Sequence, residues 1–482
     1  MKHYYIKTML AAICLLPLCQ VSASDFEKDG VYYNISSTAA KTVSVASSPA
    51  DAPYSGVVTI PATVESSGIT YSVTAIAQEA FKNCTRLTGV NIGAEVTTIY
   101  WRAFYGCDAL GEIVIPDNVT SIPRRSNYSY EAYSEAFAGC TSLENVTIGS
   151  KVATMGTGVF KGCASLKSVT IKDGCAVIGD ECFSGCSKLP SIDIPSSVAT
   201  IGNEAFLDCV ALNTVEIPGG TTTIGNSAYK GCTAMTKATI GDDVESIGSQ
   251  AFYGCTKLRN VTLGDNLRTI YYRAFMNCTD LEEIVIPDYV ASLPRRSNYS
   301  YEAYSEAFAN CTALTTVTLG KRIAEMGTGV FAGCSNIKVI NVKDGCSLIG
   351  ATCFKDSKEI EAINMECNDV PTVSDNSFAN YDATLYVPTA SLESYKAHEV
   401  WSKFLIMDHS ETGIMSLSDD GLAISIKNGE LVVNGVKDGT PVNIYTVDGR
   451  LVSSTDGDAH VMLRSGTTYI IKVKGRTVKM MR

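Results

Sequence analysis

Histidine is nearly missing from this sequence. The 482 residues contain four histidines, and the three outside the N-terminal segment, His398, His409 and His460, do not lie at ligand spacing from one another. A histidine metal site or a Ser-His-Asp triad needs such side chains to converge. Glycine-rich phosphate loops, the G-x-S-x-G elbow and the H-E-x-x-H motif are missing as well. We therefore expect no catalytic residue, no metal ion and no cofactor.

Positive charge is also in short supply. Lys and Arg number 39 against 50 Asp and Glu, which gives a formal net charge of -11, and no long basic run occurs. Nucleic acids and anionic membrane surfaces are bound through a concentrated positive field. The sequence therefore argues against both as partners.

Long apolar runs are missing after the N-terminus. No later stretch approaches the ~20 apolar residues that a membrane helix needs. Residues 1–23 combine Lys2 and Lys7 with the apolar run TMLAAICLLPLC and the closing residues Val21-Ser22-Ala23. This pattern predicts a signal peptide, so we expect an exported protein. Cys19 as a lipoprotein acceptor is the alternative, although Leu18 is bulkier than the residue such a site prefers.

Cysteine, in contrast, is abundant and regularly spaced. Eighteen cysteines in an exported protein would ordinarily indicate a disulfide framework. Here, however, eleven of them follow an aromatic residue by three positions, at steps of 23 residues and two steps of 33. The pairs are Phe81/Cys84, Phe104/Cys107, Phe137/Cys140, Phe160/Cys163, Phe183/Cys186, Phe206/Cys209, Tyr229/Cys232, Phe252/Cys255, Phe275/Cys278, Phe308/Cys311 and Phe331/Cys334. Phe354 with Ser357 continues the series without the thiol.

Between these marks the residues follow the pattern L-x-x-V-x-I-P-x-x-V-x-x-I-G, as in LPSIDIPSSVATIG from Leu189 to Gly202. Apolar residues two or three positions apart, interrupted by Pro or Gly, predict short strands joined by tight turns. A fixed period in the twenties predicts a solenoid, because one coil cannot bury its apolar side alone. We expect a mainly β fold of about twelve 23-residue coils, with inward ladders of Phe, Leu and Val.

The eleven ladder cysteines are predicted to be buried, reduced thiols. Stacked strands lie about 4.8 Å apart, farther than the ~3.8 Å between the Cβ atoms of a disulfide. A metal-binding row of thiolates would need ligands that converge. Cys175/Cys182 and Cys346/Cys353 flank one tight corner outside the ladder, so each pair is either a disulfide or two more buried small residues. Cys367 has no evident partner.

The motif AFxGCxxLxxVxIPxxVxxIG resembles the BspA-like leucine-rich repeats of bacterial surface proteins of the Bacteroides type, over about residues 75 to 381. The resemblance implies a right-handed solenoid. FEKDGVYYNI from Phe26 and YSGVVTIPATV from Tyr54 resemble its N-terminal cap, and ATLYVPTASLESYKAHEVWSKF from Ala383 resembles its closing turn, with a short helix. We therefore divide the chain into a signal peptide (1–23), an N-terminal cap (24–74) and a solenoid with its C-terminal cap (75–408).

The remaining residues follow a different pattern. Residues 409–420 are rich in Ser, Thr, Asp and Gly, which predicts a linker. Residues 421–482 alternate apolar and polar side chains between Asn-Gly and Asp-Gly turns, which predicts a small β-sandwich. VNIYTVDGRLV and YIIKVKGRTVKMMR in this tail resemble the C-terminal sorting domains of proteins exported across bacterial outer membranes.

One stretch occurs twice. RRSNYSYEAYSEAF runs from Arg124 to Phe137 and again from Arg295 to Phe308, 171 residues later. Each copy holds ten extra residues, so each is an insertion at one corner of a coil, where binding faces are often found. The alternative is a copied block whose loops bind nothing. Against it, the sixteen residues from 123 to 138 equal those from 294 to 309, whereas only half of the next 48 positions agree.

Stacking should bring the residues one coil earlier beside each insertion. We therefore predict two ligand-binding corners, made of Tyr100, Trp101, Arg102, Arg124, Arg125, Tyr128, Tyr130 and Tyr133, and of Tyr271, Tyr272, Arg273, Arg295, Arg296, Tyr299, Tyr301 and Tyr304. Tyr, Trp and Arg dominate binding hot spots, and paired arginines can hold a carboxylate or sulfate. A protein or a glycan would fit such a surface.

A row of carboxylates is the remaining candidate for chemistry. Asp242, Asp265 and Asp288 take equivalent positions in successive coils and would stack about 4.8 Å apart. Such a row could bind Ca²⁺ or serve as acid and base. The local sequences GDDV, GDNL and PDYV are turn sequences, so we expect each Asp to cap its own backbone instead.

The first hypothesis is a non-enzymatic, adhesin-like binding protein, the role that the family resemblance implies. It would be a monomer, at the cell surface (outer membrane) or secreted, and would recognise a host extracellular matrix protein or glycan. A structural surface spacer without a specific ligand is the alternative. A carbohydrate-active enzyme built on a carboxylate row is a remote third reading.

Overall fold

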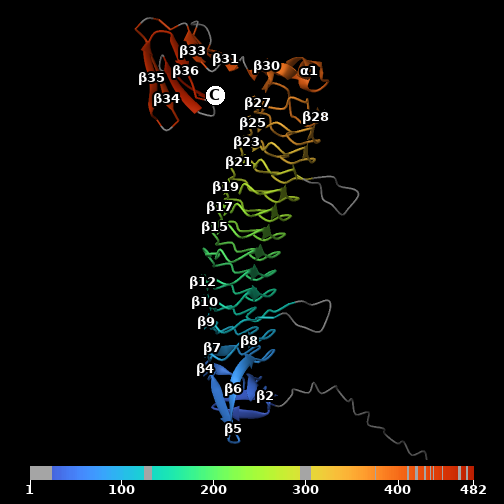
Figure 1. The fold of residues 1–482 in the computed structure, drawn as a ribbon, viewed down its shortest axis with the longest axis vertical. Helices are drawn as coiled ribbons and strands as arrows, with labels where there is room; N and C mark the ends of the chain where they lie inside the picture. The colour runs from blue at the N-terminus through green and yellow to red at the C-terminus, as the bar shows by residue number, and fades with distance from the viewer. Residues whose placement is uncertain are drawn as a thin grey trace, which may run out of the picture.

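The structure is a computed structural model. It describes residues 24–123, 133–293, 305–374, 376–409 and, with gaps at 418–421, 428–429, 435, 438, 448, 465–467 and 474–475, residues 412–481. The fold is mainly β: a long stack of coils joins an N-terminal cap to a small C-terminal sandwich (Figure 1). The predicted fold class is therefore confirmed.

The N-terminal cap begins both sheets of the stack. Its strands are β1 (Phe26–Lys28), β2 (Val31–Ser37), β3 (Thr42–Val45), β4 (Ser55–Thr59), β5 (Thr63–Ser66) and β6 (Ile69–Ile76). Five of them form a sheet in the order β1-β2-β3-β6-β5, and the first short strand of the stack, β8 (Thr98–Ile99), pairs with β6. Strand β4 pairs in parallel with β7 (Arg86–Asn91). The cap thus covers the apolar end that the first coil would otherwise expose.

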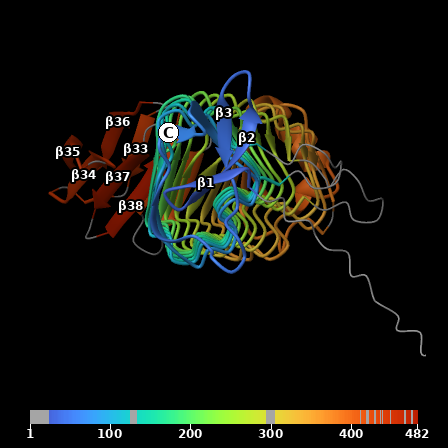
Figure 2. The ribbon, with the colours of Figure 1, turned by 90° about the horizontal axis from the view of Figure 1, so that it is seen from below.

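Most coils contribute a long strand and a short strand, and these pair in parallel with the strands of neighbouring coils; the coil of residues 189–202 has only a short strand, so the long strands form several separate sheets. The long strands are β7, β9 (Glu112–Val114), β10 (Asn145–Ile148), β12 (Ser168–Ile171), β15 (Thr214–Ile217), β17 (Lys237–Ile240), β19 (Asn260–Thr262), β21 (Glu283–Val285), β23 (Thr316–Leu319), β25 (Val339–Val342), β27 (Ala362–Met365), β29 (Thr384–Val387) and β30 (Leu405–Asp408). After β8, the short strands are β11 (Thr154–Met155), β13 (Val177–Ile178), β14 (Thr200–Ile201), β16 (Thr223–Ile224), β18 (Ser246–Ile247), β20 (Thr269–Ile270), β22 (Ser292–Leu293), β24 (Glu325–Met326), β26 (Leu348–Ile349) and β28 (Thr372–Val373). Seen along the stack, successive coils superimpose (Figure 2).

The core is a column of aromatic rings. From Phe81 to Phe378, each ring stacks on the next with centroids 4.8 to 5.5 Å apart and planes within 15° of parallel. Tyr54 of the cap adds a ring at the start, and Trp401 and Phe404 close the other end edge-on. The column therefore extends beyond the predicted series, which ends at Phe81 and Phe354, by Tyr54 at one end and by Phe378 with its two closing rings at the other.

Backbone and thiol hydrogen bonds tie the coils together around this column. The Phe206 N–H donates to the Ala228 carbonyl of the next coil, at 2.7 Å. The Cys209 thiol donates to the Phe183 carbonyl of the previous coil, at 3.2 Å. The residues two positions either side of Phe206 have positive φ, 55° at Glu204 and 56° at Asp208. These turns bring each aromatic residue inward at the same angle, so the rings stack.

All cysteines of the described residues are buried, free thiols. Neither of the suggested disulfides is formed, because the thiols of each pair have different partners. Cys175 contacts the Val177 carbonyl, whereas Cys182 contacts the Met155 sulfur. Cys346 and Cys353 likewise contact the carbonyls of different residues. These cysteines serve as small buried side chains.

The C-terminal part closes the stack and then forms the sandwich. The closing turn contains η1 (Thr389–Ser391), the predicted short helix as α1 (Leu392–Ala397), and η2 (Trp401–Lys403). One sheet of the sandwich has the order β31-β32-β33-β36 and the other β35-β34-β37-β38. Their bounds are β31 (Thr412–Leu417), β32 (Leu422–Lys427), β33 (Glu430–Asn434), β34 (Pro441–Thr446), β35 (Leu451–Asp456), β36 (Ala459–Met462), β37 (Thr468–Val473) and β38 (Arg476–Met481).

The linker predicted at 409–420 is only partly a linker. Its residues 412–417 form β31, which pairs antiparallel with β32. The Ser, Thr and Gly content of this segment suggested a loop, but Thr, Ile and Met within it suit a paired strand. Among the described residues, no helix is long and apolar enough to cross a membrane.

Removing one ring from the middle of the column should destabilise the whole stack. Phe206→Ala leaves a cavity between two rings, and we expect a loss of about 3–5 kcal/mol in unfolding free energy, measured by urea denaturation. Thr214→Ala, an exposed position on β15, is the control and should change stability by less than about 0.5 kcal/mol. A loss at Phe206 no larger than the control would contradict the role of the column.

The buried thiols should be unreactive in the folded protein. Burial raises the pKa of Cys84 to about 11 and that of Cys209 to about 12, so both stay protonated at pH 8. Ellman's reagent should therefore label none of the sixteen cysteines rapidly in the native protein at pH 8, and all of them in denaturant. Rapid native labelling of several thiols would show that the ladder is open to solvent.

Candidate functional site

The described residues that flank the two insertions lie at equivalent places in the stack. The first follows the Ser121–Ile122 segment, which bridges to the strand before and the strand after it, and the second follows β22. Nine predicted site residues fall outside the described residues: Arg124, Arg125, Tyr128, Tyr130, Arg295, Arg296, Tyr299, Tyr301 and Tyr304. The described part of each corner therefore consists of the coil before the insertion and the residues where the chain returns.

Tyr100 and Tyr271 stand where an ordinary repeat has glycine. In the pattern I-G, the glycine is required because a Cβ on Gly202 would lie 2.5 Å from the backbone nitrogen of Asp180. In the two coils that precede the insertions, this position holds Tyr100 and Tyr271, which are 45% and 43% exposed. The replacement of a repeat glycine by tyrosine is thus a sequence signal for a side chain that projects from the corner.

The next residues of the first corner form a compact cluster. The Arg102 guanidinium lies over the Trp101 ring, 4.7 Å from its centroid, and over the Tyr105 ring at 4.9 Å. Its Nε donates to Glu135 Oε2 at 2.5 Å, which joins the two coils across the insertion. Arg102 itself has positive φ, so the ion pair and the ring contacts hold a backbone conformation that is uncommon for arginine. The sequence patterns did not reveal the roles of Tyr105 and Glu135.

The second corner repeats this arrangement with one ring fewer. Arg273 lies 4.6 Å from the centroid of the Tyr272 ring, and its Nε donates to Glu306 Oε2 at 2.6 Å. Tyr272 is only 8% exposed, so it supports the arginine and offers little surface to a ligand. Met276 takes the position of Tyr105. The corners are therefore similar but not identical in their described residues.

The chain returns from each insertion along a fixed path. Tyr133, which is 37% exposed, forms a β-bridge with Thr157 of the next coil. The Ser134 N–H donates to the Thr157 carbonyl at 2.9 Å, and the Ser134 carbonyl accepts from the Arg102 N–H at 2.9 Å. Ser305 makes the corresponding two bonds, with Thr328 and Arg273. Each insertion therefore re-enters the stack in register.

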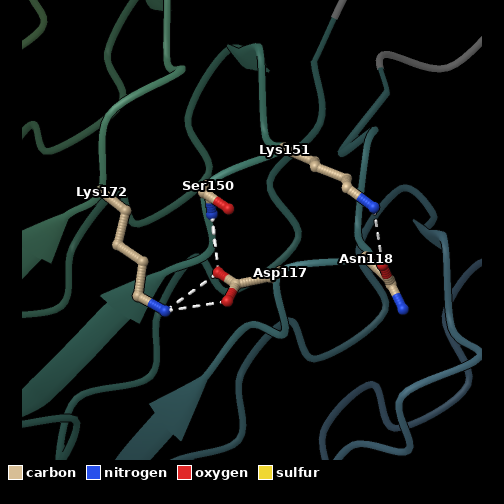
Figure 3. Close-up of polar contacts among 5 residues, drawn as sticks. All are labelled: Asp117, Asn118, Ser150, Lys151 and Lys172. Carbon is tan, nitrogen blue, oxygen red and sulfur yellow. Dashed lines mark hydrogen bonds and ion pairs between the residues drawn. The ribbon is translucent and has the colours of Figure 1, made fainter.

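A second contact holds the coils around the first insertion, at the turn between long and short strands (Figure 3). Asp117 lies in the coil that leads into the insertion, and its carboxylate accepts from the Ser150 N–H of the following coil at 2.9 Å. It also accepts from Lys172 Nζ, one coil further on, at 2.9 Å. Beside it, Lys151 Nζ donates to Asn118 Oδ1 at 2.8 Å. The Ser150 amide and Lys172 hold the Asp117 pKa below its usual value.

We call the contacts of Asp117 with Ser150 and Lys172 a clamp. The second copy has an equivalent clamp at Asp288, but the pair of residues beside it differs. Asp288 accepts from the Lys321 N–H at 3.2 Å and from Lys343 Nζ at 2.9 Å. Lys343 and the Lys321 amide lower the pKa of Asp288. Where the first copy has the Asn118–Lys151 hydrogen bond, the second places Arg322 4.5 Å from the centroid of the Tyr289 ring. A contact between the coils is kept although both residues differ.

The carboxylate row does not form a metal site. Asp242 accepts from the Asp265 N–H at 3.3 Å, and Asp288 is engaged by its lysines. We had expected each aspartate to cap the backbone of its own turn. Asp242 instead caps the backbone of the next coil. Among the described residues, no group of three or more His, Cys, Asp and Glu could hold a metal ion.

The two corners are held at a fixed separation. Seven ring steps of 4.9 to 5.5 Å lead from Phe104 to Phe275. At about 4.8 to 5 Å per coil, Tyr100 and Tyr271 lie about 35 Å apart along the stack.

Comparison with known proteins gives one family match. The family model described as BspA type leucine rich repeat region matches residues 62–135, 127–236, 222–305 and 300–394. No curated protein matches the sequence.

Several solved structures are similar. One is a leucine-rich repeat protein from Bacteroides ovatus, with 25% identity, 80% of this chain and 99% of that chain covered, and a TM-score of 0.47. A leucine-rich cell surface protein from Faecalibacterium prausnitzii has 24% identity over 66% and 94%, with a TM-score of 0.34. The pneumococcal vaccine antigen PcpA has 17% identity over 80% and 98%, with a TM-score of 0.43.

Acid should release the two clamps. Because the folded pKa of Asp117 and Asp288 is lowered, their contribution to stability is complete above the unfolded pKa and is lost as pH falls through the folded value. The double variant Asp117→Asn, Asp288→Asn should therefore unfold at lower urea concentration than wild type at pH 7. The difference should shrink as pH falls below the unfolded Asp pKa of about 3.9 and vanish once the folded carboxylates are protonated. Asp173→Asn, at an exposed turn aspartate that accepts no hydrogen bond from a described residue, should show no such difference. A gap that persists at low pH would contradict the clamp.

Proposed function

Because the chain belongs to the BspA-type leucine-rich repeat family, we propose that it is a non-enzymatic, adhesin-like binding protein. Its ligand is a host extracellular protein or glycan, and its binding sites are the two Tyr- and Arg-rich corners. We further propose that the chain is exported and acts as a monomer at the cell surface or outside the cell. The N-terminal segment with its signal-peptide pattern supports export.

The observation that carries this proposal is the pair of exposed tyrosines, Tyr100 and Tyr271, beside two identical insertions. Each stands where most repeats have a glycine that the close approach of the backbones requires. The requirements of the fold therefore do not explain why tyrosine occupies these two positions. Tyrosine offers a large, amphipathic contact area at low entropic cost, which is why it is common in binding surfaces.

The arginines of the described residues have a supporting role in this proposal. Arg102 and Arg273 each pair with a glutamate of the next coil. They hold the rings beneath them and the returning chain in place, so a ligand carboxylate or sulfate would have to compete with Glu135 or Glu306. The rings and hydroxyls of the corners, rather than these two arginines, would make the principal contacts.

The fixed spacing of the corners suits a repetitive ligand. Two weak sites about 35 Å apart on one rigid stack can bind two units of the same polymer at once. Effective concentration then raises the avidity by ~10²-fold or more without any new contact. A matrix fibre or a long glycan has the required repeats.

A structural spacer without a specific ligand remains the second candidate. The clamps at Asp117 and Asp288 favour it, because they reinforce the stack where the insertions interrupt it. In that case the corners would be by-products of a copied block. The carboxylates of Asp242 and Asp288 are engaged in contacts between coils, which disfavours an enzyme built on this row.

Binding should depend on the corner tyrosines. We would measure binding of the full chain to immobilised matrix proteins and glycans by biolayer interferometry, beside Tyr100→Ala, Tyr271→Ala and the variant with Tyr128, Tyr130, Tyr299 and Tyr301 changed to Ala. Loss of one corner should weaken binding to a repetitive ligand by about tenfold or more. Tyr289→Ala, at a tyrosine that is 49% exposed but lies away from the corners, is the matched control. Binding that survives every corner variant would move the site elsewhere, and no binding to any ligand would favour the spacer.

A further inference from the structure

A cleft of about 420 Å³ lies where the N-terminal cap meets the first coil. It crosses the outer face of one sheet, from Ser36 on β2 through Ser44 on β3 and Thr74 on β6 to Thr98 on β8. The exposed Tyr100 and Gln78 complete its lining. Its volume falls within the range of small-molecule sites in proteins.

The floor of the cleft is set by the strand register. Ser44 pairs with Ala75, and Ala75 pairs with Thr98, so two hydroxyl groups flank one small side chain across three neighbouring strands. Neighbouring strands lie about 4.8 Å apart, which leaves a shallow space above Ala75 that is open to solvent. Ala77 is equally small. Tyr100, at the position equivalent to Ala77 in the next coil, borders the cleft on one side.

Apart from the Thr97 hydroxyl, which donates to the Thr74 carbonyl at 3.2 Å, several polar side chains of this cleft are available to a ligand. The side chains of Ser36, Ser44, Thr98 and Gln78 and the Tyr100 hydroxyl make no hydrogen bond to any residue that the structure describes. Hydroxyl and amide groups both donate and accept, so together they match a ligand that does the same.

Among the described residues, no acidic or basic side chain lines the cleft. A charged ligand would lose hydration there without gaining an opposite charge, which disfavours it. A saccharide combines several hydroxyl groups with an apolar face, and the face of the Tyr100 ring provides an apolar surface for it. The lining therefore selects a neutral sugar.

The second corner does not offer this lining. Tyr271 and Thr269 correspond to Tyr100 and Thr98, but Glu245 and Arg268 take the positions of Thr74 and Thr97. An ordinary coil also stands there in place of the cap strands that carry Ser36 and Ser44. Of the two described corners, only the one at the N-terminal end of the stack has this hydroxyl-lined cleft.

We propose that this cleft binds the end of a neutral saccharide, with Tyr100 against the sugar ring and the hydroxyls of Ser44 and Thr98 as hydrogen-bond partners. The site needs neither insertion and no second corner. It rests on the proposed function only through Tyr100, which both sites share.

The test compares matched positions in the full chain. Lactose and N-acetylglucosamine serve as neutral probes and 3′-sialyllactose as the charged one, in calorimetric titrations and by the emission of Trp101, next to Tyr100. We expect Tyr100→Ala and Thr98→Val to weaken binding of a neutral probe by about tenfold or more. Thr269→Val, at the position of the second corner equivalent to Thr98, should bind like wild type.

Three results would overturn the proposal: no binding of either neutral probe, equal loss in Thr98→Val and Thr269→Val, or tighter binding of the charged probe than of lactose. Thr98→Val removes a hydroxyl without changing the shape of the side chain, so it keeps the test decisive if Tyr100→Ala alters the fold. Failure here is distinct from failure of the proposed function, because that function requires Tyr271 and this site does not.

Discussion

The stacking of each coil on the next is the interaction on which the whole structure depends. Each inward ring stacks on the next with centroids about 5 Å apart, and the backbone around each ring forms hydrogen bonds to the neighbouring coils. A repeat array is stabilised mainly by such contacts between neighbouring coils, so every coil must present the same inner surface. This requirement explains the strict 23-residue period, the small buried thiol after each ring, and the glycine where backbones pass closely.

The same constraint explains how the chain tolerates its insertions. Ten extra residues separate the coils of Phe104 and Phe137 in the sequence, yet the two rings stack at 4.9 Å with nearly parallel planes. The Arg102–Glu135 pair and the Asp117 clamp cross the interruption at two different corners. Surface residues at a corner can therefore change while the ring column continues. The residues that determine the fold are thus different from those that could come to bind a ligand.

The 23-residue period predicted most of the fold because every repeat carries the same pattern of apolar, aromatic and turn residues. It predicted the parallel ladders, the ring column and the reduced thiols, and the two 33-residue steps located the insertions. It did not reveal the pairing of Arg102 with Glu135, because that contact crosses 33 residues and depends on two turns with positive φ. The burial of Tyr272 and the cleft at the cap were equally hidden, since both depend on how neighbouring strands lie. Strand β31 was missed because it lies in a segment, residues 409–420, whose overall content of Ser, Thr, Asp and Gly is typical of a loop.

The central claim is that the ring column holds two corners at one fixed separation. Glu112 on β9 and Glu283 on β21 are exposed, equivalent positions seven coils apart, and the native cysteines are buried. We would label Glu112→Cys and Glu283→Cys with nitroxides in the full chain and measure the distance between them by pulsed electron paramagnetic resonance. The account predicts one narrow distribution centred at about 35 Å, allowing for the label arms. A broad distribution, or a centre far from this value, would contradict it.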